Sequence, residues 1–314
     1  MKQRASVEDL PPPAPETFRQ KLSYWQYKAA WRAAATMRDG TSVRVARRLG
    51  QAWYLAASTR QRDQVRANLR RIVGPATERQ LEEWVRRAYE SYARYWIDAF
   101  RLHKMEATDV LARSTGENLD VMDGLLANGE GAILATAHLG SWDVGAFFTT
   151  QRNWGMVVVA EVVEPRRLFD EFVALRRRAG LEVIPLVRGG DMIDRLVEVV
   201  RQGGLATLLA DRDLAKRGPI VEFFGEPCRL PPGPAILAQR TGRPVCVGAF
   251  LTHDEGYHGV IMEPLHLADL SVEDATQLVA RDLEQLIGRF PDQWHVFVRN
   301  WLADREPDHP ALAA

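Results

Sequence analysis

The sequence predicts an α/β protein whose mixed, mostly parallel central sheet is flanked by helices and follows an N-terminal helical region. Two observations lead to this fold class. From residue 131 onward, short apolar runs alternate with amphipathic stretches, which is the pattern of strands and helices that succeed one another in an α/β sheet. Residues 19–127 instead carry apolar positions at three- and four-residue spacing, as helices do, with no strand candidate among them.

The chain divides into four predicted parts. Residues 1–18 contain four closely spaced prolines and little periodicity, so we expect a flexible tail. Residues 19–127 form the helical region and 128–305 the α/β core. We expect these two parts to fold together as one compact domain, because 314 residues can bury a sizeable common core. Residues 306–314 form a second tail.

The individual elements follow from the spacing of apolar residues and from turn signals. In the helical region, helices are expected at 22–37, 43–57, 61–73 and 77–102. In the core, strands are expected at 132–137, 155–160, 182–185, 205–210, 245–251, 259–262 and 295–298. Helices are expected between them at 141–152, 165–180, 190–202, 233–241 and 271–289. The run Asp254-Glu-Gly256 is typical of a hairpin turn and adds an antiparallel element to the sheet.

Composition narrows the function classes. The chain has 41 basic and 41 acidic residues, and no apolar run approaches the roughly 18 to 20 residues that a membrane-spanning helix needs. No signal-peptide pattern stands at the N-terminus, so we expect the protein on the cytoplasmic side. Cys228 and Cys246 offer neither a disulfide framework nor a metal-ligand spacing, and dinucleotide, phosphate-loop and nucleophile-elbow motifs are absent. We expect no metal and no cofactor.

Positive charge concentrates in the N-terminal third, because residues 19–104 contain 19 basic and 7 acidic residues. Trp25 and Trp31 stand there beside Lys28 and Arg32, and aromatic rings beside cations are typical of an interfacial helix at anionic lipid headgroups. The same pattern fits a helix whose aromatic face packs on the rest of the protein. A nucleic-acid interface is disfavoured, because no nucleic-acid-binding module accompanies the basic region.

His138 and Asp143 are the candidate catalytic residues. An apolar run delivers the histidine at its end, and Ser141 follows as a candidate helix N-cap, which puts Asp143 in the first turn of a helix. A histidine side chain has an ordinary pKa of about 6.5 and can accept a proton at neutral pH. A carboxylate on its second ring nitrogen would fix its tautomer. The pair therefore indicates a general base with its orienting acid.

The run His138-Leu-Gly-Ser-Trp-Asp143 resembles a motif of the bacterial membrane-lipid acyltransferases, in which histidine is followed after four residues by Asp or Glu. This family includes the lipid A late acyltransferases and the phosphatidylinositol mannoside acyltransferases of actinobacteria. The resemblance covers residues 20–302 and extends, in the family's order, to Tyr95-Trp96, Phe100-Arg-Leu102, Leu209-Ala-Asp-Arg-Asp-Leu214, Val221-Glu-Phe-Phe-Gly-Glu226, Gly233-Pro-Ala235, Trp294-His295 and Trp301. Aspartate at 143 and the run 210–214 are closer to the phosphatidylinositol mannoside branch.

The resemblance implies acyl transfer without a covalent enzyme intermediate. His138 would take a proton from a sugar hydroxyl of a glycolipid, a phosphatidylinositol mannoside, and the hydroxyl would attack an acyl-CoA thioester. The resemblance also favours docking by the basic aromatic helix, which would make the protein peripheral on the inner leaflet, at the cytoplasmic face of the plasma membrane. Alternatives are a lipid A type lauroyl or myristoyl transferase using acyl carrier protein, thioester hydrolysis, and a non-catalytic peripheral membrane protein.

Further substrate-binding residues follow from the same resemblance. Glu161 and Arg176 are implied to bind or orient the acceptor, although charged residues in such positions are equally compatible with surface ion pairs. Glu222 is implied to contact the acceptor headgroup. Asp211 and Arg212 directly follow a predicted strand, where polar groups either form a network beneath a site or close a loop.

Overall fold

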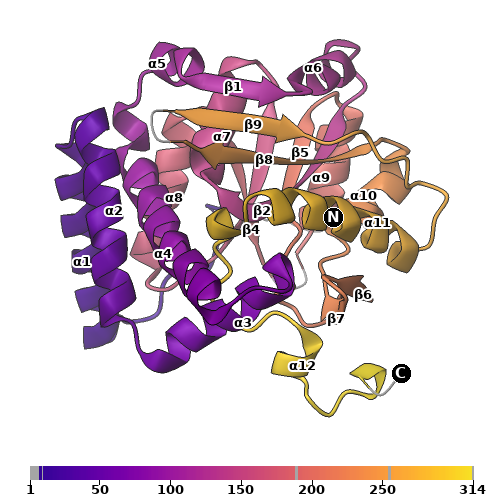
Figure 1. The fold of residues 1–314 in the computed structure, drawn as a ribbon. Helices are drawn as coiled ribbons and strands as arrows, with labels where there is room; N and C mark the ends of the chain where they lie inside the picture. The colour runs from indigo at the N-terminus through magenta and orange to yellow at the C-terminus, as the bar shows by residue number, and fades with distance from the viewer. Residues whose placement is uncertain (1–6, 9, 188–189, 254–255, 313–314) are drawn as a thin grey trace.

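A seven-stranded sheet forms the centre of the fold (Figure 1). The computed structural model describes residues 7–8, 10–187, 190–253 and 256–312. The strands of this sheet are β1 (Ser114–Glu117), β2 (Ala132–Gly140), β3 (Met156–Glu161), β4 (Glu182–Leu186), β5 (Leu205–Leu209), β8 (Val245–Thr252) and β9 (Tyr257–Ile261). Their order is β1-β9-β8-β2-β5-β3-β4, and every neighbouring pair is parallel except β8 with β9. The predicted fold class is confirmed.

The N-terminal helical region consists of α1 (Phe18–Ala35), α2 (Asp39–Ala56), α3 (Thr59–Val73) and α4 (Glu78–Arg101). Three of these helices begin with a capping box, in which an N-cap hydroxyl and a glutamine three residues later each accept a backbone hydrogen bond. The pairs are Thr17 with Gln20, Ser58 with Gln61 and Thr77 with Gln80. These helix starts are therefore specified by the local sequence.

Helices cover both faces of the sheet (Figure 1). The helices that follow the helical region are α5 (Ala107–Ala112), α6 (Leu119–Ala127), α7 (Trp142–Gln151), α8 (Arg166–Arg178), α9 (Met192–Arg201), α10 (Gly233–Thr241), α11 (Val272–Arg289) and α12 (Leu302–Arg305), with short 3-10 helices at Leu102–Lys104, Pro291–Gln293 and Pro310–Leu312. Of these, α12 packs on the separate strand β7 at residues 226–229 and not on the seven-stranded sheet. On one face, Ile133 and Leu139 of β2 pack with α9, α10 and α11. On the other, α6, α7 and α8 pack over Leu134, Met156 and Val183.

Helix α4, the longest of the described helices, joins the helical region to the core. It packs against α1, α2 and α3 on one side and reaches β2 and α7 on the other. Its last three turns are buried almost continuously from Ala93 to Arg101. They include an ion pair between Arg94 Nε and Asp98 Oδ2 at 2.7 Å. The aromatic side chains of α4 are thereby held beside the end of β2.

Two strand predictions need correction. The edge strand β1 lies in the region predicted to be helical throughout; its sequence Ser-Thr-Gly-Glu has no apolar alternation, and its pairing with β9 defines it. Residues 295–298 form no strand. Their neighbour Trp294 makes only an isolated bridge to Leu139, while Phe297 packs against Tyr89 of α4 instead. A separate two-stranded sheet, β6 (Ile220–Phe223) and β7 (Glu226–Arg229), lies where no strand is predicted.

The other six predicted strands each overlap an observed strand. The antiparallel pairing of β8 with β9 confirms the predicted hairpin, although its turn residues Asp254 and Glu255 lie outside the described residues. Residues 1–6, 9 and 313–314 of the two predicted tails also lie outside them. Across the described part of the chain, no helix is both long and apolar enough to cross a bilayer.

Candidate active site

His138 stands near the end of β2, on the face of the sheet that α7 covers. Side chains alternate along a strand, so Leu134, Thr136 and His138 point to the same side, and all three line one cavity. Gly140 then ends the strand with φ +69°, and a Cβ atom there would lie only 2.2 Å from the carbonyl oxygen of Phe250. The glycine therefore permits the sharp turn from β2 into α7.

Asp211 holds the imidazole of His138. Strands β2 and β5 are parallel neighbours with Thr136 opposite Leu209, so His138 and Asp211 meet two residues further on. Asp211 Oδ1 lies 2.9 Å from His138 Nδ1, and Oδ2 accepts a 2.8 Å hydrogen bond from the His138 backbone N–H. The indole N–H of Trp294 donates to the same Oδ2 at 2.8 Å. The carboxylate is thus fixed on both oxygens.

The environment keeps Asp211 ionised although its side chain is fully buried. Burial acts to raise the pKa of this carboxyl, but the His138 ring and the hydrogen bonds from His138 and Trp294 outweigh it and hold the pKa below its ordinary value. A carboxylate at Nδ1 favours the tautomer protonated on that nitrogen. His138 Nε2, which has no hydrogen-bond partner among the described residues, is left able to act as a base.

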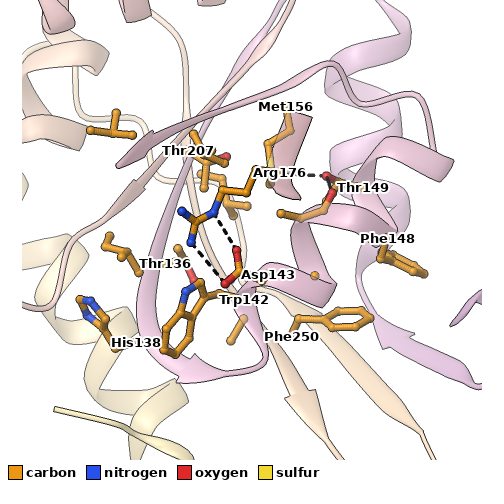
Figure 2. Close-up of a pocket in the computed structure, with 18 of the residues that line it drawn as sticks. Thr136, His138, Trp142, Asp143, Phe148, Thr149, Met156, Arg176, Thr207 and Phe250 are labelled. Atoms are coloured by element: carbon orange, nitrogen blue, oxygen red, sulfur yellow. Dashed lines mark hydrogen bonds and ion pairs between the residues drawn. The ribbon is translucent and has the colours of Figure 1, made fainter. Parts of the chain in front are cut away.

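The prediction that Asp143 holds the imidazole is wrong. Asp143 does lie in the first turn of α7, but its carboxylate bonds Arg176, with Nε to Oδ1 at 2.8 Å and Nη2 to Oδ2 at 3.3 Å (Figure 2). It also accepts a 2.9 Å hydrogen bond from the Tyr95 hydroxyl. The turn at Gly140 separates the two groups, so the imidazole meets β5 while Asp143 faces α8.

Aromatic side chains wall the site between α4 and the core. Trp142 stacks on Tyr95 with ring centroids 3.8 Å apart and presents its ring edge-on to His138 at 5.4 Å. Burial raises the pKa of Tyr95 well above its ordinary value, and the Asp143 carboxylate adds to the shift. Tyr95 therefore stays protonated and donates to Asp143. This wall places the His138 ring beside aromatic surface on one side and open cavity on the other.

An apolar cavity of about 320 Å³ adjoins His138 between the sheet and α7. Its walls include Ala146, Phe148, Trp154, Met156 and Ile261. Its charged groups are few: the Asp143–Arg176 pair, Glu161 at the exposed end of β3, and His138 itself. A cavity with one base and long apolar walls fits an extended apolar chain whose reactive carbonyl lies near that base.

Only two of the five predicted substrate-binding residues line the apolar cavity. Glu161 and Arg176 both line the cavity, whereas Asp211 lies buried behind His138 and positions it instead of meeting a substrate. Arg212 lines a separate hollow. Glu222 is exposed on the β6–β7 hairpin, where its backbone exchanges hydrogen bonds with Gln277 of α11, so it lies apart from the cavity. The motif around Glu222 shares no surface with His138.

Helix α1 packs some of its aromatic residues on the protein and exposes others to solvent, so both interpretations of its sequence apply in part. Trp31 stacks on Phe100 and Phe172 with centroids 5.6 and 6.2 Å away, and Lys28 pairs with Glu171 of α8. Both side chains are half-buried against the protein, so their role in membrane docking stays a prediction. Trp25 and Arg32 remain exposed, and Phe18 and Leu22 join Trp25 on the solvent side with exposures of 80%, 48% and 56%.

Sequence reasoning missed Trp294 as the second residue that binds the Asp211 carboxylate, and it placed His295 simply in the sheet and core. His295 N–H donates to the carbonyl of His138 at 2.7 Å, and its Nε2 lies 2.9 Å from the Ser91 hydroxyl. Burial lowers the pKa of His295 to about 3, and the nearby His138 adds to the effect. Trp294 and His295 lie beside Leu139 and His138 of β2, far from them in sequence. No local sequence pattern contains this proximity.

We expect acid to destabilise the protein through His295. The unfolded chain protonates this imidazole near the ordinary 6.5, whereas the folded protein does so only near 3. Because the folded pKa is lower, stability falls as pH decreases from 6.5 toward 3, by up to about 1.4 kcal/mol per pH unit. Urea unfolding at about pH 7 and about pH 5 should show a smaller loss for His295→Gln than for the native protein. Equal losses would contradict the assignment.

Comparison with known proteins decides the family. Residues 16–303 match the family model described as bacterial lipid A biosynthesis acyltransferase. A Mycobacterium tuberculosis protein named phosphatidylinositol mannoside acyltransferase is 35% identical over 286 residues, 89% of each chain. A protein of the same name from Mycolicibacterium smegmatis is 33% identical over 292 residues, 91% of this chain and 93% of its own. The chain belongs to the lipid A biosynthesis acyltransferase family.

Neither the cysteines nor Ser141 of this acyltransferase offers a ready nucleophile to His138. Cys228 and Cys246 are buried, and burial raises the pKa of each thiol to about 12. The hydroxyl of Ser141 is fully buried and makes no hydrogen bond to the imidazole or to any described residue. The site therefore suits a base that activates a hydroxyl group of the acceptor directly.

Proposed function

We propose that this acyltransferase moves a fatty acyl chain from an acyl-CoA thioester to a sugar hydroxyl of a phosphatidylinositol mannoside. The proposal rests chiefly on one observation, the His138–Asp211 pair beside an apolar cavity. The names of the two relatives support a mannoside acceptor. A thioester donor fits this chemistry, because it offers an electrophilic carbonyl and a thiolate that leaves easily. The choice of CoA as its carrier rests on the resemblance to the mannoside branch of the family.

The proposed reaction proceeds in two steps without a covalent enzyme intermediate. His138 Nε2 takes the proton of the acceptor hydroxyl as its oxygen forms a bond to the thioester carbonyl carbon. The tetrahedral intermediate then collapses, its carbon–sulfur bond breaks, and the thiolate leaves with the proton that His138 returns. Asp211 keeps the imidazole in the required tautomer and stabilises the imidazolium between these steps. The proposed reaction uses no cofactor.

The apolar cavity is the proposed site of the acyl chain. Ala146 lies on α7 and lines the cavity, so Ala146→Phe places a ring in the space that the chain would fill. We expect kcat/KM for a palmitoyl donor to fall by about tenfold or more while an acetyl donor is hardly affected, since burying each CH₂ contributes about 0.8 kcal/mol. The measurement is acyl transfer across a series of donor chain lengths.

The exposed Ala127 at the end of α6 provides a matched control for this prediction. Ala127→Phe adds the same ring outside the cavity and should leave the chain-length profile unchanged. A profile of Ala146→Phe that falls equally for short and long donors would count against the cavity as the acyl site.

We place the enzyme at the cytoplasmic face of the plasma membrane, held on the inner leaflet by α1 and α2. Both helices stand on one side of the molecule (Figure 1). Phe18, Leu22 and Trp25 of α1 recur at four- and three-residue spacing and are all exposed, as are Leu49 and Leu55 of α2. Exposed cations accompany them on both helices, including Arg19, Lys21, Arg32, Arg44 and Arg48. This combination suits anionic lipid headgroups above an apolar layer.

Replacing Phe18, Leu22 and Trp25 together by serine should weaken binding to vesicles that contain anionic lipid by about tenfold or more, because inserting each such side chain contributes roughly 1.5–3 kcal/mol when fully buried. Co-sedimentation measures the effect. Leu111→Ser, which removes an exposed apolar side chain of α5, is the control. Undiminished vesicle binding by the triple variant would refute docking through α1.

A donor and acceptor panel tests the function itself. The purified enzyme is incubated with acyl-CoA or acyl carrier protein donors and with phosphatidylinositol mannoside, lipid A precursor or no acceptor, and products are identified by mass spectrometry. An acylated mannoside formed from acyl-CoA supports the proposal. Free fatty acid alone would indicate hydrolysis, and an acylated lipid A precursor would redirect the assignment to the other branch of the family.

A further inference from the structure

Outside the apolar cavity, a second hollow is lined by four arginines, Arg60, Arg212, Arg299 and Arg305. They come from separate segments: the first turn of α3, the loop after β5, the segment before α12, and the end of α12. The hollow also contains Asp63. We refer to it as the arginine hollow. Bringing four guanidinium groups together against one carboxylate costs electrostatic free energy unless an anion is bound there.

None of these four side chains forms an ion pair with a carboxylate in the part of the chain that the structure describes. The contrast is clearest on α3, where Arg66, Arg70 and Arg71 each pair with acidic residues. The only carboxylate of the hollow, that of Asp63, is itself taken by Arg66. The positive charge of the arginine hollow is therefore left without compensation by the protein.

The guanidinium of Arg305 is held by a hydrogen bond to a backbone carbonyl and not by an ion pair with a carboxylate. Its Nη2 donates to the carbonyl oxygen of Asp213 at 2.9 Å, while its Nη1 is buried and has no hydrogen-bond partner among the described residues. The Asp213 carboxylate accepts backbone N–H groups of its own loop, including those of Arg217 and Gly218. One guanidinium donor of this hollow-lining residue is therefore left without a protein acceptor, which costs free energy unless another group supplies one.

The arginine hollow adjoins the active site. Arg212 directly follows Asp211, which holds His138. Phe297 lines the hollow and packs against Tyr92 with ring centroids 5.0 Å apart, and Tyr92 lines the apolar cavity. These two rings therefore lie between the hollow and the cavity. A substrate whose reactive end lies beside His138 can therefore place a charged portion in the hollow.

We infer that the arginine hollow binds a phosphate group of one of the two substrates. Guanidinium groups match phosphate oxygens in geometry as well as in charge, and four of them exceed what a single carboxylate would require. The choice of substrates rests on the proposed function: the donor carries the phosphates of CoA, and the acceptor carries the phosphodiester of phosphatidylinositol. Both present the same chemistry to the hollow, so the test separates them.

The test uses Arg60→Gln/Arg299→Gln, which removes two exposed arginines and should leave the fold intact. Arg281→Gln, at an exposed position of α11 outside the hollow, removes the same kind of charge as a control. Calorimetry measures binding of adenosine 3′,5′-bisphosphate against adenosine, and of glycerophosphoinositol against myo-inositol. Since no turnover is needed, the result does not depend on whether acyl transfer is detected.

We expect the native protein to bind at least one phosphorylated probe more tightly than its phosphate-free counterpart. The double variant should lose this preference, with about tenfold weaker binding or more, while Arg281→Gln keeps it. Loss for the bisphosphate assigns the hollow to the donor, and loss for glycerophosphoinositol assigns it to the acceptor. The inference is overturned if neither phosphate strengthens binding, or if the double variant binds both phosphorylated probes as the native protein does.

Discussion

The His138→Ala enzyme is expected to lose acyl transfer by about 10²- to 10⁴-fold, the usual contribution of a positioned general base. His138 Nε2 is the free ring nitrogen beside the cavity, and its Nδ1 is already committed to Asp211. Without the imidazole, the acceptor hydroxyl must lose its proton to water. The measurement is the initial rate of product formation at saturating donor and acceptor.

The fold should survive this change. The His138 side chain is 26% exposed, and Asp211 Oδ2 would keep its hydrogen bonds from the backbone of residue 138 and from Trp294. A thermal melt close to that of the native protein is the first control. The second is His258→Ala, which removes a histidine that pairs with Glu117 and lies outside the cavity lining. Comparable rates for His138→Ala and His258→Ala would exclude His138 as the base.

Asp211→Asn is expected to reduce kcat by about 10²- to 10⁴-fold with little change in KM; the same substitution in a serine-protease triad lowers kcat by about 10⁴. The Asn amide can donate to Nδ1, which favours the tautomer with its proton on Nε2. That tautomer cannot accept a proton from the acceptor. The predicted split between kcat and KM separates this role from a merely structural one, because Asp211 is fully buried and does not line the cavity.

Asp143→Asn provides the matched comparison. It leaves the largely buried guanidinium of Arg176 without its counter-charge, and breaking a buried ion pair in this way costs about 3–5 kcal/mol. We therefore expect a lower unfolding temperature for Asp143→Asn and a smaller loss of kcat in the protein that remains folded. The assignment of Asp211 would be refuted if Asp143→Asn abolished turnover at full stability while Asp211→Asn remained active.

The fold was largely predictable because its signals are local. Apolar runs bounded by turn residues gave β2, β5 and β8, and hydroxyl N-caps with glutamines three residues later specify the starts of α3 and α4. β1 was not predictable, since Ser-Thr-Gly-Glu becomes a strand only through the free edge of β9. The strand predicted at 295–298 is absent because Phe297 of this apolar run packs on Tyr89 of α4 and the run has no neighbouring strand to pair with.

The candidate site could be predicted only in part. His138 was evident because a strand delivers it, but its carboxylate partner lies 73 positions away and depends on β5 being the neighbour of β2. No local pattern contains strand order. Proximity in sequence favoured Asp143, which the turn at Gly140 directs to Arg176 instead. The same limit applies to Glu222, whose motif lies on the separate β6–β7 hairpin.

In the proposed reaction His138, oriented by Asp211, activates the hydroxyl group of a phosphatidylinositol mannoside that attacks acyl-CoA. The most direct test is single-turnover acyl transfer followed by mass spectrometry for the native enzyme, His138→Ala, Asp211→Asn and His258→Ala. We expect an acylated mannoside from the native enzyme and from His258→Ala, and at least about 100-fold slower formation by the other two variants. Native rates in His138→Ala, or no acylated mannoside from the native enzyme, would contradict the proposed reaction.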